Sequence, residues 1–488
     1  MYLLQKTYSL ILNPIGKVTS RVDEKISNAV ITLCCTGLIA YFAALFSVGI
    51  KTFMRGARTQ NSMFCSAILF VLIVFSIREE LKPVKWNKFL FYTFFIAGAG
   101  VVAISFLHPI GSGYRAWGML MMFGFPCVYY VWNNRADYDE LYKRLAAATV
   151  IVGIAFYIYC FTLAPKGAIA FDAVLPSRMK GSFYDANMLS MIGMIMVDSC
   201  LYMLLVNRSS RAWFALTAAG FGIGVDITLL GQSRLAVLAV LGGMFAFTVY
   251  FLKIRRDKSF EWSRGRSYLR VLALLVSVIV FIMAGVLMKG INSRALDGQN
   301  TVNTASTRAA ALAVYAASNG AAAAEEDADK TVIDRFKPGG SGDDTYTVGR
   351  VDIWKNYARY LNLTGNDFSK TDWEEMTGKY KVKHAHNNFL EIGYRCGVPV
   401  AVIHTLLELA AGIICLIYLF GRRYREPAYM FCIVFMVTYA VQSLFDIATI
   451  PFERPAPFFF YMAMIPIFMY RRETEETLRI SEQDEKAE

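Results

Sequence analysis

Scarce titratable side chains gather in one short stretch of this chain, "HAHNNFLEIGYRCG", residues 384–397. The sequence holds four histidines among 488 residues, and two of them, His384 and His386, stand here one residue apart. A neutral imidazole is the side chain best matched to accepting a proton near pH 7. We therefore interpret His384 and His386 as candidate general bases.

Two other interpretations of this histidine pair stay open. A histidine at a helix N-terminus is often purely structural, and an HxH pair can also ligate a metal. A catalytic zinc site, however, usually takes three protein ligands, and the other two histidines, His108 and His404, are distant in the sequence. An HExxH motif is absent. We expect no metal ligands and no cofactor.

Polar residues that follow the histidines are expected to support them. They are Asn387, Glu391 and Arg395. If the stretch is helical from its start, His384 and Asn388 share one face at i, i+4.

Three arginines form a second group with chemical potential. Arg234 lies in "GQSRLAVLAV" beside an apolar run, Arg178 lies in "SRMKGSFYDAN", and Arg350 lies in "GRVDIW". A guanidinium group is a planar fork that binds phosphate oxygens in pairs. A charge next to a membrane segment is a functional hypothesis, although Arg234 can also extend to the interface. Together with a basic histidine, the three arginines suit a diphosphate-linked donor, whose leaving group they would stabilise.

The composition indicates a membrane protein. The chain is 56% hydrophobic and 18% charged, with a mean hydropathy of +0.40. Runs of nearly uncharged residues recur, each long enough to cross about 30 Å of hydrocarbon as a helix. The net charge of +12 comes from basic residues between these runs, so we assign it to membrane topology and expect no nucleic-acid partner.

The predicted fold is therefore all-α and polytopic, with about twelve transmembrane helices. They are expected near 28–50, 61–77, 88–107, 116–132, 146–163, 187–206, 212–230, 233–252, 268–288, 396–420, 427–447 and 455–470. With both termini in the cytoplasm, loops such as "REELKPVKWNK", "NNRADYDELYKR" and "GRRYREP" face inward, as the positive-inside bias requires. The basic loop "KTFMRGARTQ" is the exception, because this topology places it outside.

The chain then divides into five parts. The predicted parts are a cytoplasmic N-terminal segment (1–27), transmembrane helices 1–9 (28–288), a large external loop with active-site residues (289–395), transmembrane helices 10–12 (396–470) and a cytoplasmic tail (471–488). Within the loop, an Ala-rich stretch near 300–330 has low complexity. "VGRVDIWKNYARYLN" predicts an amphipathic helix with Val351, Trp354, Ala358 and Leu361 on one face.

Several familiar motifs are missing. The sequence has no GxxxxGK[ST] phosphate loop and no GxSxG nucleophile elbow, which argues against ATP hydrolysis and against an α/β-hydrolase. The nine cysteines lie in or beside apolar runs and give no metal spacing and no disulfide framework.

The order of "GQSRLAVLAV", "GRVDIW" and "HAHNNFLEIGYRCGVPVAV", with a large loop between the first and the last, resembles the O-antigen ligase and O-antigen polymerase family. This resemblance implies a metal-independent membrane glycosyltransferase of the bacterial cell envelope. Such enzymes move a glycan from an undecaprenyl-diphosphate carrier to an acceptor hydroxyl on the outer face of the inner membrane. Ligases use a lipopolysaccharide core as the acceptor, and polymerases use the next carrier-linked unit in polysaccharide biosynthesis.

Carried over by position, His386 matches the loop histidine of the family, while Arg234, Arg350 and, more weakly, Arg178 match its arginines. The expected partners are the carrier-linked donor, a glycan or lipid acceptor and membrane lipids. The expected location is the inner membrane of a bacterium, with the active site facing outward. One sequence does not separate ligase from polymerase.

A transporter or flippase of a solute or lipid-linked glycan is the alternative function. It would place ionisable residues near helix centres. The candidates are Asp198, Asp226, Glu408 and Asp446. We expect Asp226 and Asp446 to lie near the outer helix ends, on the same surface as the arginines, which favours an outward-facing site.

Overall fold

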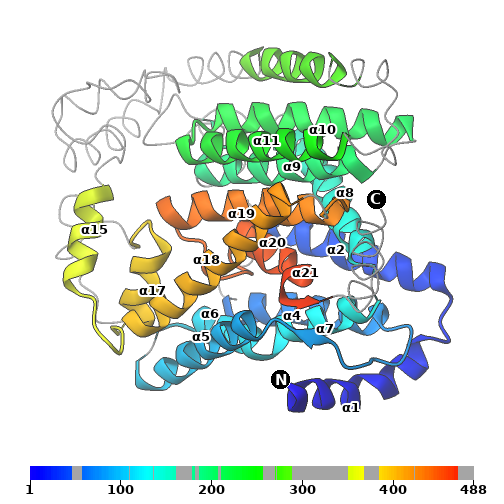
Figure 1. Cartoon of the computed structure of the whole chain (residues 1–488). Helices are drawn as coiled ribbons and strands as arrows, with labels where there is room; N and C mark the ends of the chain where they lie inside the picture. The colour runs from blue at the N-terminus through cyan, green and yellow to red at the C-terminus, as the bar shows by residue number, and fades with distance from the viewer. Residues whose placement is uncertain are drawn as a thin grey trace, which may run out of the picture.

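The computed structural model describes residues 1–46, 58–108, 110–135, 137–160, 179–181, 186–206, 210–255, 270, 272–287, 350–367, 384–421 and 424–470. These parts are almost entirely helical, which confirms the all-α polytopic fold (Figure 1). Arg178, the Ala-rich stretch near 300–330, the "KTFMRGARTQ" loop up to residue 57 and the predicted tail (471–488) lie outside the described residues.

The elements follow in chain order. They are α1 (Tyr2–Thr19), α2 (Glu24–Phe46), α4 (Arg58–Ser76), β1 (Lys85–Trp86), α5 (Lys88–Leu107), α6 (Ser112–Met119), η1 (Leu120–Gly124), α7 (Phe125–Arg135), α8 (Tyr138–Ile158), α9 (Ala186–Val206), α10 (Arg211–Leu230), α11 (Arg234–Arg255), α15 (Arg350–Arg359), α17 (Asn388–Cys396), α18 (Val398–Phe420), α19 (Pro427–Phe445), α20 (Pro455–Ala463), α21 (Ile465–Phe468) and β2 (Met469–Tyr470). A further apolar helix covers Leu272–Leu287.

Eight helices in the described parts are long and apolar enough to cross a membrane. They are Glu24–Leu45, Lys88–Leu107, Tyr138–Ile158, Ala186–Val206, Arg211–Leu230, Arg234–Ile254, Val398–Phe420 and Pro427–Phe445. Each corresponds to one predicted segment. The predicted segments 61–77 and 268–288 correspond to the shorter apolar helices Met63–Ser76 and Leu272–Leu287. The predicted segment 116–132 lies within α6, a short π-helical stretch (η1) and α7.

The last predicted span, 455–470, differs in the structure. In place of one helix the chain forms α20, with 9 residues, then α21, with 4 residues, and the two-residue strand β2, which pairs antiparallel with β1. Pro466 lies three residues after the end of α20 and cannot donate the backbone hydrogen bond that a continuous helix needs. All residues of α20 are buried, so this apolar segment forms protein core and does not face lipid.

The N-terminal segment contains a helix of its own. In α1, Tyr8 and Leu12 are buried while Leu3 and Leu10 are exposed. The Tyr8 hydroxyl donates a hydrogen bond to the carbonyl oxygen of Phe123 at 2.7 Å. This helix therefore packs against η1, where the sequence predicted only a cytoplasmic N-terminal segment (1–27).

The helix directions gather several termini at one end of the bundle. Helices α11 and α19 run antiparallel, because Tyr250 donates to the carbonyl of Glu426 while Gly242 packs against Val437. The N-terminus of α11 and the C-terminus of α19 therefore lie at the same end. Helix α9 also runs antiparallel to α19, since Asp198 binds Thr438 and Met191 lies beside Gln442. We call the end with Arg234 and Asp446 the site end.

The loops that the sequence predicts to be cytoplasmic meet at the opposite end. Tyr202 donates to the carbonyl of Asp139, and Lys253 donates to carbonyl groups at the C-terminus of α18. Lys82 donates its backbone N–H to Asn134. The basic loops and the site end are therefore separated by the length of the helices.

Candidate active site

The two loop histidines precede a helix and are not part of it. Helix α17 begins at Asn388, and its N-cap Asn387 accepts a hydrogen bond from the backbone N–H of Leu390 at 3.1 Å. An N-cap residue has extended backbone angles, so the helix cannot continue back to His384. The stretch is therefore not helical from its start, and His384 and Asn388 do not share a helical face.

The backbone of His386 is strained. Its φ of +50° lies in the left-handed region, which residues other than glycine seldom adopt. Gln232, two residues before Arg234, has a φ of +49°, and among the described residues these are the two non-glycine positions with positive φ. Strain of this kind concentrates at functional sites, and here it falls in two of the three motifs that the sequence analysis selected.

His386 lies against a carboxylate from a distant part of the chain. Its Nδ1 atom is 3.3 Å from Oδ1 of Asp446, the residue that ends α19. The side chain of His386 is 22% exposed, so part of it reaches the surface. The rings of His384 and His386 meet edge to face with centroids 4.1 Å apart. An imidazole held by a carboxylate has a defined tautomer and orientation, as a general base requires.

Two arginines surround Asp446. Arg454 Nη1 lies 2.7 Å from its Oδ2, and the backbone N–H of Ile447 donates to its Oδ1 at 2.8 Å. Burial alone would raise the pKa of Asp446, but Arg454 and the two histidines hold that pKa well below its usual range. Burial lowers the pKa of the Arg350 guanidinium, while the Asp446 carboxylate acts against this shift. The structure thus brings Arg350 into electrostatic contact with the histidine site.

His384 is partly buried beside His386. Burial first, and then the nearby His386, lower the pKa of His384 to about 4. The ring is therefore uncharged at neutral pH and able in principle to accept a proton.

The supporting residues Glu391 and Arg395 form a buried ion pair. Arg395 Nε lies 3.1 Å from Glu391 Oε1, and the two side chains are 2% and 3% exposed. The other carboxylate oxygen of Glu391 accepts the backbone N–H of Ala385 at 2.9 Å, between the two histidines. Tyr114 of α6 donates to the same carboxylate at 3.4 Å. This pair fixes the histidine loop and lies too deep to bind a substrate itself.

Helix α15 covers the histidine loop, with a different face from the predicted one. Ile353 and Tyr357 are its buried residues and pack with Ala385 and Tyr394, whereas Ala358 is exposed. The helix ends at Arg359, so the predicted stripe that reached Leu361 continued past its end. Packing against the loop brings Arg350, the first residue of the helix, toward Asp446.

Arg234 begins α11 at the site end of the bundle and is half-buried. The preceding Ser233 accepts the backbone N–H of Ala236 at 3.4 Å, which caps the helix start. Met179 donates its backbone N–H to the carbonyl of Leu230 at 3.0 Å, so the chain next to Arg178 runs beside the "GQSR" motif. The three sequence motifs are therefore brought to one end of the bundle.

Arg454 was not among the residues that the sequence suggested, whereas Asp226 lies four residues before the end of α10, near the helix end where it was expected. Arg454 follows a short loop after α19, and a cation in a loop predicted to be external was the signal that could have found it. Asp226 lies inside α10, where Tyr157 donates to it at 3.1 Å and Gly285 packs against it. Asp446 joins the histidines as expected.

His384, His386 and Asp446 also have the ligand types of a metal site. Their ligand atoms all lie within 4.8 Å of one another. The guanidinium of Arg454 occupies one carboxylate oxygen of Asp446, and Arg350 adds a second positive charge nearby. These cations oppose the approach of a divalent ion, so the residues fit an uncharged base with its carboxylate better than a metal centre.

Comparison with known proteins gives one family match. Residues 219–405 match the family model described as O-antigen ligase, which covers Arg234, Arg350 and both loop histidines. No curated protein matches the sequence. Residues 219–405 of this membrane protein are therefore an O-antigen ligase domain, in agreement with the family that the three motifs predict.

Proposed function

We propose that this protein is a membrane glycosyltransferase that moves a glycan from an undecaprenyl-diphosphate carrier to an acceptor hydroxyl. The observation that carries the proposal is the pairing of a partly exposed His386 with the ionised Asp446, next to Arg350 and at the same end of the bundle as Arg234. A base beside a group of guanidinium forks suits the attack of a hydroxyl on a diphosphate-linked sugar.

In the proposed reaction, Asp446 accepts a hydrogen bond from Nδ1–H of His386, which leaves the lone pair of Nε2 free for the acceptor. As the acceptor oxygen forms a bond to the anomeric carbon, its proton passes to Nε2. The bond between the anomeric carbon and the phosphate oxygen breaks, and the diphosphate leaves with the electron pair. Displacement from the opposite face inverts the configuration of the sugar carbon.

The arginines are proposed to bind and stabilise the leaving group. Arg234, Arg350 and Arg178 would hold the diphosphate, with charge stabilisation increasing as the bond breaks. Arg454 has a different proposed role, because it keeps Asp446 ionised and oriented toward His386. His384, uncharged at neutral pH, is the second candidate base.

An apolar groove of about 380 Å³ would accommodate part of the carrier's isoprenoid chain. It lies between α9, α10, α11 and the helix Leu272–Leu287. Val237 lines it one helical turn from Arg234, and the lining continues along α11 to Phe247. A lipid whose diphosphate binds Arg234 would therefore find an apolar surface for its chain directly below.

The proposed location is the inner membrane of a bacterium, with both termini in the cytoplasm and the site end outside. The separation of the basic loops from the site end supports this orientation through the positive-inside bias. The acceptor distinguishes a ligase from a repeat-unit polymerase, and both remain within the proposal. We also propose that catalysis needs no metal.

The transporter alternative would need ionisable groups free to bind a passing solute. Three of the candidate carboxylates are instead hydrogen-bonded by hydroxyl groups: Asp198 by Thr438, Asp226 by Tyr157 and Glu408 by Tyr439. These contacts favour a structural use of the intramembrane carboxylates.

The first test replaces the native gene with one encoding His386→Ala and follows the cell-surface glycan. The expected result is a loss of surface polymer while carrier-linked glycan accumulates, with the protein inserted at wild-type levels. Long unligated chains would identify a ligase, and single repeat units would identify a polymerase. His108→Ala, at the C-terminal end of α5, is the matched control and should leave the glycan unchanged. Unchanged glycan in both His386→Ala and His384→Ala would overturn the proposal, and solute uptake would then be measured.

A further inference from the structure

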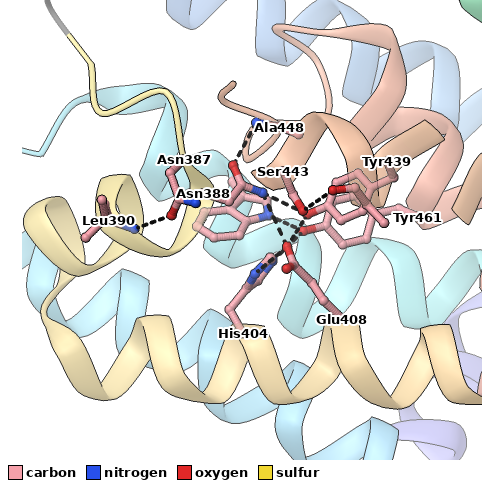
Figure 2. A network of polar contacts seen from close by, with 11 residues as sticks. Asn387, Asn388, Leu390, His404, Glu408, Tyr439, Ser443, Ala448 and Tyr461 are labelled. Atoms are coloured by element: carbon pink, nitrogen blue, oxygen red, sulfur yellow. Dashed lines mark hydrogen bonds and ion pairs between the residues drawn. The ribbon is translucent and has the colours of Figure 1, made fainter. Parts of the chain in front are cut away.

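We propose that Glu408, a carboxylate inside the transmembrane helix α18, acts through Asn388 as a positioning residue for the His386–Asp446 pair. This inference rests on the proposed function of that pair. It assigns a role to a buried polar network that takes no direct part in the chemistry above (Figure 2).

Two adjacent asparagines hold the backbone on either side of Asp446. Asn387 Nδ2 donates to the carbonyl of Leu444 at 3.1 Å, two residues before Asp446. Asn388 Oδ1 accepts the backbone N–H of Ala448 at 2.7 Å, two residues after it. Because these asparagines directly follow His386, the same two contacts fix the base relative to its carboxylate.

The hydrogen bond from the Ala448 N–H to Asn388 forms in only one of the two orientations of the Asn388 amide. An amide donates from its nitrogen and accepts at its oxygen, so rotation by 180° would put its NH₂ group against the N–H of Ala448. In the structure, Asn388 Nδ2 donates to the Tyr439 hydroxyl at 3.1 Å and to Glu408 Oε1 at 3.3 Å. Oε1 of Glu408 also accepts the Tyr439 hydroxyl, so it faces Asn388 as an acceptor and selects the orientation in which Oδ1 faces Ala448.

Glu408 is in turn held by its own partners, as Figure 2 shows. Tyr439 donates to its Oε1 at 2.6 Å, and His404 Nδ1 lies 3.2 Å from the same oxygen. Trp117 donates to the Tyr461 hydroxyl at 2.8 Å, and that hydroxyl lies 3.3 Å from His404 Nε2. With the proton of His404 on Nδ1, the donors run in one direction from Trp117 through Tyr461 and His404 to Glu408.

Because the network is buried, its side chains have little freedom to exchange hydrogen-bond partners. Asn388 is 2% exposed and His404 and Tyr439 are each 1% exposed. A buried polar group that loses its partner costs about 1–3 kcal/mol, so the network strongly disfavours alternative hydrogen-bond arrangements. The network connects α6, α17, α18, α19 and α20. By fixing Asn388, it sets the distance between His386 and Asp446.

The test uses the full-length protein in liposomes, with carrier-linked glycan and acceptor extracted from the membranes of the native host. Glu408→Gln keeps the shape of the side chain but can present either an NH₂ group or an oxygen to Asn388. We expect kcat to fall by about 10- to 100-fold, because a displacement of about 1 Å at a catalytic group has effects of this size. The KM for the donor should change by less than about threefold, since the arginines are untouched.

A double-mutant cycle separates positioning from a general structural role. In an Asp446→Asn background, Glu408→Gln should cause little further loss of kcat if it acts through the His386–Asp446 pair. A full and independent loss in that background would overturn the inference. Asp198→Asn, a second buried carboxylate inside a span, is the matched control and should keep kcat within about threefold of the wild type.

Tyr439→Phe is the second variant, in case Glu408→Gln fails to accumulate in the membrane. It removes one hydroxyl that orients Glu408 and should give a smaller loss of kcat with the same dependence on Asp446. Wild-type kcat in Tyr439→Phe, or in a Glu408→Gln protein that inserts normally, would contradict the inference. Failure of the proposed function looks different, because His386→Ala itself would then retain transfer.

Discussion

His386 and Asp446 meet with Nδ1 and Oδ1 3.3 Å apart, although one residue lies in the loop before α17 and the other ends α19. Replacing the carboxylate by an amide keeps the shape but removes the charge that orients the ring. We expect Asp446→Asn to lower kcat on the order of 10²-fold, less than His386→Ala, because the base is still present. Steady-state kinetics of both variants in liposomes checks this order. A larger loss in Asp446→Asn than in His386→Ala would show that Asp446 has a role beyond orienting His386.

Arg234 is expected to bind the diphosphate of the donor. Arg234→Ala should raise the KM for the carrier-linked glycan by about 10- to 100-fold, the range for losing hydrogen bonds to a charged group. Arg234→Lys should recover only part of this loss, because an ammonium group cannot bind two phosphate oxygens as a planar fork. Arg211→Ala, an exposed arginine at the other end of the bundle, is the control. A lowered kcat with an unchanged KM would place Arg234 in a different step.

Metal removal is expected to leave the activity unchanged. Arg454 already binds Asp446 at 2.7 Å, and a divalent ion among His384, His386 and Asp446 would have to displace this contact. Glycan transfer should therefore proceed at the same rate in a chelator as in buffer containing zinc or magnesium. Loss of activity in chelator, with recovery on adding one metal, would identify these three residues as its ligands.

The stability of the protein should fall as the pH is lowered through the range in which His384 titrates. Its pKa is about 4 in the folded protein, below the ordinary value of about 6.5. Between these values the unfolded chain binds more protons, so the stabilisation is complete above about pH 6.5 and is lost toward pH 4. The loss is on the order of 3 kcal/mol.

His384→Asn should remove this part of the acid sensitivity. The measurement is the thermal unfolding midpoint of purified wild type and variant between pH 7.5 and pH 4.5, to be recorded in the same detergent. As the pH is lowered, the unfolding temperature of the wild type should fall further than that of the variant. If the unfolding temperatures of the two proteins fall equally with pH, groups other than His384 cause the acid sensitivity.

The apolar groove offers a test of where the carrier chain binds. Leu241→Trp adds a large ring to a half-exposed position of the groove and should raise the KM for a full-length carrier, because the ring occupies space that the chain would use. A donor with a shortened isoprenoid chain should be affected less. Leu238→Trp changes an equally apolar, exposed residue of α11 that does not line the groove. Similar effects of the two substitutions would exclude the groove as the binding site.

Much of the membrane fold was predictable because charged residues bound long apolar runs. The predicted segment 88–107 coincides with α5, and 187–206 and 212–230 each differ from α9 and α10 by one residue at the start. Helix α8 begins at Tyr138, well before the predicted 146, because its first turns carry charged residues that hydropathy assigns to a loop. The segment 455–470 was misread because hydropathy does not distinguish a lipid-facing helix from a buried one.

The sequence predicted which residues belong to the candidate site better than it predicted how they contact one another. Residue chemistry selected the histidines and arginines, and a weak local signal, Asn387 as an N-cap, could have placed the helix start correctly. The contact of His386 with Asp446 and the recruitment of Arg454 depend on how α17, α19 and α20 pack. Such long-range contacts leave no periodic pattern in one sequence.

The buried segment Pro455–Met469 has a consequence for biosynthesis. Phe458 packs against Phe42, Tyr461 accepts a hydrogen bond from Trp117, and β2 pairs with β1, so helices translated much earlier all close around it. During translation those helices would enter the membrane with an unfilled space between them. Arg454, at the start of the same segment, reaches Asp446 only when this space is filled. The ribosome must therefore nearly finish the described chain before the charge arrangement of the site can assemble.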